Sequence, residues 1–178
     1  YVCTTAPLNI ELKQLLPQDH PVYDTQFQID YYRGVSNNRL LFGGQGTGTC
    51  WNAEKTAQYL KGRILHVFPQ LEQVELDFVW SGTTDLTVNG ATDSRKSGDK
   101  FPVYAVHGWS GHGVAQTVRI GKAIADDFCG QSDDFEMLTQ IQHQDILWGR
   151  ALAPLVIPMA KGFYGVGAAM NPSKMVSF

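Results

Sequence analysis

The sequence predicts an α+β fold in which a mixed, largely antiparallel sheet packs against amphipathic helices. Residues 22–33 and 39–43 have alternating apolar positions and flank the turn sequence Gly-Val-Ser-Asn-Asn, a pattern typical of a β-hairpin. Residues 52–69 carry apolar side chains at helical spacing. Residues 101–128 show a third pattern, which is typical of a strand, a glycine-rich turn and a helix.

The composition is that of a folded domain, and it argues against two kinds of partner. The 178 residues are 43% hydrophobic and 17% charged, which is enough for a core. The net charge is -3 without any basic run, which argues against nucleic acid because phosphate binding needs clustered Lys and Arg. The most apolar tract, 151–160, is interrupted by Pro154 and Pro158 and is too short to span a membrane.

The three cysteines, Cys3, Cys50 and Cys129, lie far apart and match neither a metal-ligand spacing nor a disulfide framework. We therefore expect three buried thiols, no metal site and a reducing, cytoplasmic compartment. The chain begins at Tyr1 within a strand pattern and without a signal-peptide pattern. This beginning predicts a piece of a longer protein, either an expressed fragment or a processed product.

The first half of the chain predicts strands separated by helices. Residues 1–7 predict a strand, and the short amphipathic stretch 10–16 ends at Pro17. A single strand is expected over 22–33, and its alternating positions are Val22, Phe27, Ile29 and Tyr31.

A helix and a strand follow the hairpin and its glycine-rich loop. Asn52 is a good N-cap for the helix, and Pro69 stops it. Residues 74–80 alternate as a strand, on which we expect Trp80 to lie in the core. The apolar positions of the helix are Ala57, Leu60, Ile64 and Val67.

The polar stretch after this strand predicts a short strand at 86–88 and a surface turn at 94–100. The apolar run 101–107 predicts a buried strand. A helix is expected over 114–128 and a stop at Gly130. One face of that helix comprises Val114, Val118, Gly121 and Ala125.

The last part of the chain has weaker signals. Ser132 is expected to cap a short helix that runs through Met137. From Pro154 onward we expect irregular chain with one further helical piece, because proline disfavours a helix interior.

The turn Gly108-Trp109-Ser110-Gly111-His112-Gly113 is the feature with the clearest chemistry. Three glycines in six residues let a backbone approach a ligand closely. The start of the following helix has unpaired N–H groups, which suit an anion or a ring oxygen that gains electron density. The alternative is a tight turn whose glycines only allow close packing.

This turn, followed by a helix with Gly121 and Ala125, resembles the C-terminal flavin-binding signature of the D-amino-acid-oxidase superfamily. Asp30-Tyr31-Tyr32-Arg33 and Arg39-Leu40-Leu41-Phe42-Gly43-Gly44 resemble the hairpin of its substrate domain, and Val79-Trp80-Ser81-Gly82 resembles the strand that returns to the flavin. These phrases and Ser110-Gly111-His112-Gly113 are most similar to the gamma-glutamylputrescine oxidases. The resemblance covers most of residues 1–130.

The resemblance implies an FAD-dependent oxidoreductase that oxidises the C–N bond of an amine and passes a hydride to the flavin. It divides the chain into a substrate-domain part at about 8–80, an FAD-binding segment at about 81–130 and an extension at 131–178. It places the turn and the helix start against the pyrimidine edge of the isoalloxazine. The implied flavin contacts are Gly108, Ser110, Gly111, His112, Gly113 and Val114.

Two departures from relatives that act on α-amino acids bear on the substrate. Such enzymes often carry an Arg after the Trp-x-Gly strand to clamp the carboxylate, whereas this chain has Thr83 and Thr84. Gly111 also stands where some of them have another Arg. The substrate implied is a small amine, either gamma-glutamylputrescine-like or another polyamine derivative or secondary amine.

The sequence assigns no catalytic acid or base. The candidates for lining the substrate site are Tyr31, Tyr32 and Trp109. For the two adjacent tyrosines the alternative is ordinary alternation, with one in the core and one on the surface.

The chain contains no G-x-G-x-x-G fingerprint for the pyrophosphate of a dinucleotide, since the third glycine of Gly44-Gln45-Gly46-Thr47-Gly48 is misplaced. In the family, that fingerprint lies in an N-terminal Rossmann segment. We therefore expect this chain alone to hold FAD weakly or not at all. We also expect it to expose an apolar face and to self-associate or bind a complementing N-terminal FAD-binding segment.

Two alternatives remain open from the sequence. The isolated chain could be a non-catalytic fragment or a module that binds a ligand or partner. A serine hydrolase is the other alternative, because Gly108-Trp109-Ser110-Gly111-His112 is close to G-x-S-x-G with Ser110 as nucleophile. Against it, the last position is His112 rather than Gly, and the single histidine downstream is His143.

Overall fold

A computed structural model of the protein describes residues 1–24, 29–44, 46–145 and 149–170. The chain divides into two compact units. The first holds Tyr1–Gly82 and helix α5 (Gly149–Met170), and the second holds Thr83–Leu147. The predicted α+β class is confirmed. All strand pairs in the described residues are antiparallel, so the described sheets contain no parallel pair of the kind a mixed sheet would have.

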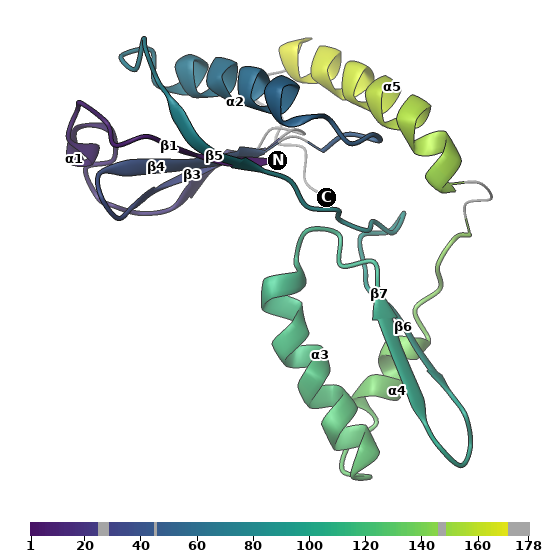
Figure 1. Ribbon diagram of the computed structural model, residues 1–178. Coiled ribbons are helices and arrows are strands. Elements are labelled where there is room, and N and C mark those ends of the chain that lie inside the picture. Colours follow the sequence, from purple (N-terminus) through teal and green to yellow (C-terminus); the bar gives the residue numbers. More distant parts are fainter. Residues whose placement is uncertain (25–28, 45, 146–148, 171–178) are drawn as a thin grey trace. The chain divides into compact units, whose positions relative to one another are not determined.

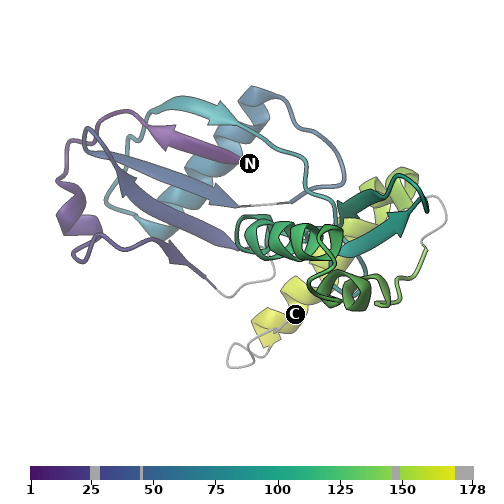
Figure 2. The same cartoon turned by 90° about the horizontal axis from the view of Figure 1, so that it is seen from below.

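The first unit is a five-stranded antiparallel sheet with one face covered by helix α2 (Ala53–Val67) (Figure 1). The strand order is β2-β3-β4-β1-β5. From below, α2 lies behind the strands (Figure 2). The strands are β1 (Val2–Thr5), β2 (Val22–Tyr23), β3 (Asp30–Val35), β4 (Arg39–Gly44) and β5 (Leu76–Trp80).

Helix α2 forms where the sequence predicts it, because its start is capped and its inner face is apolar. The side chain of Asn52 accepts the N–H of Lys55 at 2.8 Å, and the helix ends just before Pro69. Burial of this face against β1 and β4 drives the docking of helix and sheet. The buried core comprises Cys3, Leu16, Leu40, Phe42, Leu60, Ile64, Phe68, Leu71 and Val74.

The β3–β4 hairpin is confirmed, and its turn takes a left-handed backbone at two asparagines. Asn37 and Asn38 have φ of 61° and 54°, a conformation that Asn tolerates better than most residues. The side chain of Asn38 also accepts the N–H of Leu12 and donates to the carbonyls of Leu8 and Ile10. These bonds attach the segment that leads into helix α1 (Leu12–Leu15) to the turn of the β3–β4 hairpin.

The single strand predicted over 22–33 is wrong. Two strands stand there, and β2 pairs with β3 through Val22↔Tyr32 and Tyr23↔Tyr31. Alternation continues through both strands, so periodicity alone does not reveal a reversal of the chain. Phe27, one of the alternating positions, lies outside the described residues.

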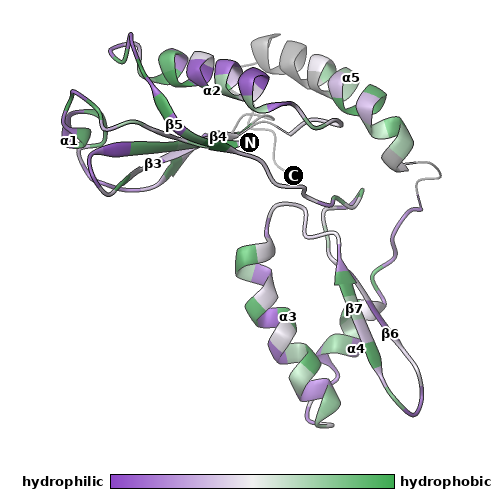
Figure 3. Cartoon of the chain, viewed as in Figure 1, coloured by the Kyte–Doolittle hydropathy of each residue, from purple (hydrophilic) through white to green (hydrophobic). Residues whose placement is uncertain are grey.

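The second unit pairs strands β6 (Asp93–Ser97) and β7 (Val103–His107) and packs helix α4 (Asp134–Thr139) and helix α3 (Gly113–Phe128) around a small core. The surface turn predicted at 94–100 is wrong in its first half, which belongs to β6, whereas residues 98–100 lie in the exposed connection to β7. In Figure 3, β6 is largely hydrophilic and β7 hydrophobic, which explains why only β7 was predicted. Backbone hydrogen bonds nevertheless pair β7 with β6, although the side chains of β6 are polar.

Two further expectations for the second unit are wrong. Residues 86–88 form no strand, and Leu86 and Val88 are exposed in a turn-rich loop. Strand β7 is also not buried, because its two ends and Ala105 are exposed. Its inward side chains, Tyr104 and Val106, pack on a core of Ile120, Ala123 and Phe135.

Helix α3 ends where the sequence predicts it, in a glycine cap. Gly130 has φ of 67°, and its N–H donates to the carbonyl of Asp127 while that of Gln131 donates to the carbonyl of Asp126. The helix buries Ile120 and Ala123, whereas the face predicted from the sequence is exposed. That exposed face, Val114, Val118, Gly121 and Ala125, is here called the outer stripe.

The C-terminal helices are partly as predicted. Helix α4 begins two residues after Ser132, whose hydroxyl accepts the N–H of Asp134 at 3.1 Å. The irregular chain expected from Pro154 is wrong, because α5 continues through Pro154 and Pro158. The two prolines are four residues apart, so the backbone bonds they lack lie on one side of the helix. No described helix has both the length and the apolar character needed to cross a membrane.

The cysteines give a first testable prediction, because only one of the three is buried. Burial raises the pKa of the Cys3 thiol to about 12, so it stays protonated and unreactive at neutral pH. Cys50 and Cys129 are exposed, which corrects the expectation of three buried thiols. A chromogenic thiol reagent is expected to label two thiols in the native chain and the third only after unfolding. The Cys50→Ser/Cys129→Ser variant is the control, and rapid labelling of it without denaturant would contradict the prediction.

Candidate functional site

Strand β7 leads into the glycine turn predicted from the sequence, and helix α3 follows. Gly108, Ser110 and Gly111 have φ of 72°, 48° and 87°, so three residues in four take the left-handed conformation. This conformation reverses the chain between strand and helix within a few residues. Ser110 is a non-glycine residue in a costly region of backbone space, so contacts around it must hold it there.

The start of α3 presents backbone donors without acceptors. The N-cap residue, His112, makes no side-chain cap, and the first turn contains no acidic residue. Within the part of the chain that the structure describes, the N–H groups of Gly111, Gly113, Val114 and Ala115 have no hydrogen-bond partner. Such amides at the positive end of a helix are suited to bind partial or full negative charge.

The residues predicted to contact the flavin therefore differ in what they offer. Gly108 is buried, and its N–H already has an acceptor. Ser110 is half-buried and tied into the turn by its hydroxyl. Gly111 and His112 are exposed, and a Cβ at Gly111 would meet nothing within 4 Å. Val114 is 95% exposed, so this part of the backbone is open to a ligand. The assignment of these residues to a flavin remains a prediction.

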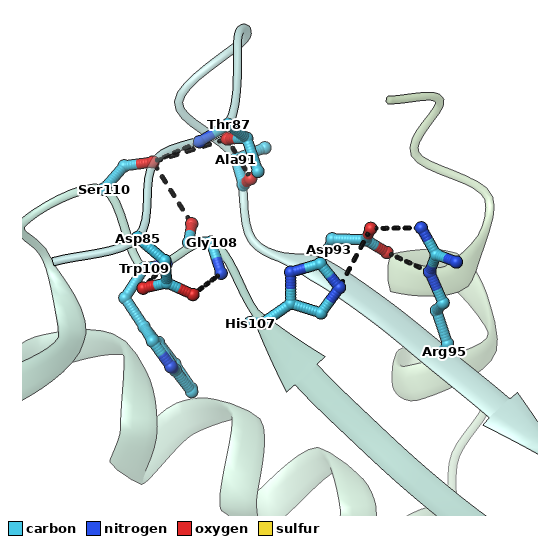
Figure 4. A network of polar contacts seen from close by, with 9 residues as sticks. All are labelled: Asp85, Thr87, Ala91, Asp93, Arg95, His107, Gly108, Trp109 and Ser110. Carbon is cyan, nitrogen blue, oxygen red and sulfur yellow. Dashed lines mark hydrogen bonds and ion pairs between the residues drawn. The ribbon is translucent and has the colours of Figure 1, made fainter. Parts of the chain in front are cut away.

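Asp85 is a site residue that the sequence analysis missed (Figure 4). Its carboxylate accepts the N–H of Gly108 and, at 3.4 Å, that of Trp109. The Gly108 bond is the main cause that lowers the pKa of Asp85, so the carboxylate is ionised at neutral pH. A single Asp in a polar loop matches no sequence motif. It could have been found only by asking which acceptors satisfy the backbone amides of a tight turn.

A second carboxylate, Asp93, supports the base of the turn. It is nearly buried at the start of β6 and accepts two bonds from Arg95, at 2.9 and 2.6 Å. His107 Nε2 lies 3.2 Å from the same carboxylate. The Arg95 bond is the main cause that lowers the pKa of Asp93. This cluster joins the first residue of β6 to the last residue of β7.

The candidate substrate residues are divided between the two units, with Tyr31 and Tyr32 in the first and Trp109 in the second. Tyr32 lies on the α2 side of the sheet, where it stacks on Phe42 at 5.6 Å and meets Phe68 edge-on at 5.0 Å. Tyr31 points to the opposite face and is 38% exposed. Trp109 packs on the core of the second unit. The two tyrosines thus follow ordinary strand alternation, and a substrate role for all three residues remains a prediction.

The face of the five-stranded sheet opposite α2 carries a cross-strand row that includes Tyr31. The register pairs Tyr31 with Gly43, Gly43 with Val2, and Val2 with Trp80. The Tyr31 ring lies on Gly43, because a Cβ there would come within 2.4 Å of ring atoms. Trp80 is 45% exposed, which corrects its expected place in the core. We call these four residues and Phe78 the open sheet face.

One protein family matches most of the chain. Residues 1–127 match the family described as FAD dependent oxidoreductase (DAO). The chain belongs to this family. The cofactor that this family implies for the intact protein is FAD.

Individual relatives share this family character. The chain is 30% identical to gamma-glutamylputrescine oxidoreductase of Escherichia coli, over 93% of this chain and 38% of that protein. It is 28% identical to probable oxidoreductase OrdL of Haemophilus influenzae, over 92% of this chain and 37% of that protein. The chain thus spans less than two fifths of the length of these curated relatives. No solved structure matches it.

The hydrolase alternative makes a prediction about Ser110. Its hydroxyl donates to the carbonyl of Gly108 at 3.1 Å and lies 3.3 Å from the N–H of Thr87. Among the described residues no histidine contacts this hydroxyl, so it lacks the base that a serine nucleophile needs. Ser110→Ala is expected to leave hydrolysis of an activated ester unchanged. Ser81→Ala is the matched control, and loss of hydrolysis in Ser110→Ala alone would contradict the expectation.

Metal ligands do not cluster in the residues that the structure describes. No group of three or more His, Cys, Asp or Glu side chains in that part of the chain could hold a metal ion. The candidate residues therefore form two groups, which are the backbone donors and two structural carboxylates of the second unit and the aromatic sheet face of the first unit.

Proposed function

We propose that this chain provides the substrate-facing sheet and the flavin-facing turn of an FAD-dependent oxidoreductase that oxidises the C–N bond of an amine. The observation that carries the proposal is the set of four unpaired amides at residues 111 and 113–115. When bound, FAD supplies the hydride acceptor, and its pyrimidine edge gains negative charge. Amides that are already oriented stabilise such charge without reorganising.

The residues of the turn fit the isoalloxazine in two respects. The open space beside Gly111 allows a ring edge to approach the backbone, since a Cβ there would meet no atom within 4 Å apart from its chain neighbours. The positive end of the α3 dipole lies at the same place. The chain has no dinucleotide fingerprint, so in this proposal residues outside it hold the ADP half of FAD.

We assign the amine substrate to the open sheet face. Burial raises the pKa of Tyr31, so its hydroxyl stays protonated and can donate or accept a hydrogen bond. Trp80 and Tyr31 supply ring faces that suit an alkylammonium group. The substrate class is a gamma-glutamylputrescine-like amine. The E. coli relative with that name, and Thr83 and Thr84 where an arginine would clamp an α-carboxylate, support this choice.

The outer stripe of α3 supports the expected partner. Val114 and Val118 are almost fully exposed, and Phe128 at the end of the helix is also exposed. Apolar surface of this kind is favourably covered by protein. We propose a complementing FAD-binding segment as the cover, with self-association when that segment is absent. Light scattering of the chain across a concentration series tests this. A monomer at all concentrations, unchanged by the flavin-binding segment of a relative, would contradict it.

A visible absorbance spectrum of the purified protein, with and without added FAD, tests the function. Flavin bands that stay with the protein on desalting and bleach with gamma-glutamylputrescine are expected at full length. The 178-residue chain is expected to be colourless, because it lacks the ADP contacts. A colourless full-length protein that ignores FAD would contradict the proposal and favour a module that only binds a partner. Bleaching by α-amino acids alone would contradict the substrate class.

A further inference from the structure

Asp85 accepts hydrogen bonds from three successive amides of the glycine turn, and Figure 4 shows its carboxylate at the N–H of Gly108. Its carboxylate accepts the N–H groups of Gly108 and Trp109, and its main-chain carbonyl accepts the N–H of Ser110 at 3.0 Å. One residue thus satisfies the whole first half of the turn. These bonds join residues that are 23 to 25 positions apart in sequence, so they form only when the chain is folded.

Contacts in the opposite direction lock the two segments together. The N–H of Thr87 approaches the hydroxyl of Ser110 at 3.3 Å, and that hydroxyl donates to the carbonyl of Gly108. The hydroxyl of Thr87 donates to the carbonyl of Ala91 at 2.7 Å, which closes the loop around it. This reciprocal bonding explains how Ser110 keeps a left-handed backbone that is otherwise unfavourable.

The amides of the turn and of the helix start therefore fall into two groups. Residues 108–110 give their amides to Asp85, whereas the amides of 111 and 113–115 remain free. The ionised carboxylate also fixes a negative charge at the turn. A negative charge near a group that is reduced to an anion makes that reduction less favourable.

We propose that Asp85 is the positioning residue of the flavin-facing turn: it holds residues 108–110 so that the amides of 111 and 113–115 face the cofactor, and its charge lowers the flavin reduction potential. This inference rests on the proposed function, since it assigns the free amides to FAD. Asp85 does not touch the reacting atoms in this proposal. It acts through the backbone that it holds.

The test compares Asp85→Asn with Asp99→Asn in the full-length protein. Both remove one charge from an exposed Asp of the second unit, but Asp99 has no bond to the turn. Asp85→Asn is expected to raise the flavin reduction potential, by about 30 mV if the preference for reduced over oxidised flavin rises about tenfold. Without FAD, the amides of Gly108 and Trp109 are expected to exchange hydrogen faster than in the wild type. Asp99→Asn is expected to change neither quantity.

The outcomes separate this inference from the function on which it rests. A wild type that binds FAD, with Asp85→Asn unchanged in potential and amide exchange, would overturn the role of Asp85 and leave the function standing. A wild type that binds no FAD would overturn the function, and the exchange measurement would still decide whether Asp85 holds the turn. If Asp85→Asn does not fold, Asp85→Glu takes its place, because it keeps the charge on a longer arm. Faster exchange at an unchanged potential would then support the proposal, and wild-type protection of both amides would overturn it.

Discussion

Replacement of Gly108 by alanine is expected to weaken FAD binding by the full-length protein roughly tenfold to a hundredfold. Gly108 has φ of 72°, and a residue with a side chain pays on the order of 1–3 kcal/mol in that region. A Cβ at this position would also lie 2.3 Å from Cγ2 of Thr87, so the loop beside the turn must move. Both effects displace the amides that follow Gly108. Titration of the apoprotein with FAD, followed by flavin fluorescence, measures the change.

Two variants separate backbone strain from the steric effect. Gly90 has φ of 73°, but a Cβ there would meet nothing within 4 Å. Gly90→Ala is therefore expected to cost stability without an equal loss of FAD affinity. Thr87→Ser removes the methyl group that the new Cβ of Gly108→Ala would strike, so Gly108→Ala/Thr87→Ser should recover part of the affinity. Wild-type FAD binding by Gly108→Ala would contradict the role of the turn.

Phe42→Ala is expected to lower the free energy of unfolding by about 3–5 kcal/mol, the largest single effect in the first unit. Phe42 is fully buried between the sheet and α2, and it stacks on Tyr32 at 5.6 Å. The cross-strand neighbour of Phe42 on β1 is Cys3, which is also fully buried. Removal of the ring leaves a cavity that these neighbours cannot fill without moving the sheet. Urea denaturation followed by circular dichroism measures the loss.

Phe78→Ala is the matched control for Phe42→Ala. Both phenylalanines stand in the same sheet, but Phe78 is 62% exposed on the open sheet face. Its removal is expected to change the unfolding free energy by no more than about 0.5 kcal/mol. Similar losses in the two variants would show that α2 does not define the buried face of the sheet. A substrate role for the open sheet face predicts that Phe78→Ala changes KM more than stability.

The patterns that the sequence predicted correctly depend on neighbours within a few residues. Asn52 caps the start of α2 and Gly130 caps the end of α3 through bonds to nearby amides and carbonyls, so both caps can be predicted from the sequence alone. The hairpin turn at Asn37 and Asn38 and the glycine turn at 108–113 are local in the same sense. The family likeness also rests on such contiguous segments.

The incorrect predictions concern residues whose structure depends on segments far away in the sequence. The pairing of β6 with β7 turns the polar segment 93–97 into a strand, because backbone bonds to β7 do not depend on its side chains. Sequence reasoning placed Trp80 in the core, yet only the position of α2 decides which face of the sheet is buried. Strand alternation likewise predicts that Tyr31 and Tyr32 point to opposite faces of the sheet, but it does not predict which of the two faces packs against α2.

By itself, the sequence determined the α+β class, the position of the glycine turn and the family to which the chain belongs. These properties are carried by local conformational preferences and contiguous motifs. Only the tertiary structure decided that Asp85 bonds the amides of 108–110, and that Tyr31 rather than Tyr32 lies on the open sheet face. The physical reason is that these contacts join segments far apart along the chain, and packing, which no local pattern encodes, selects them.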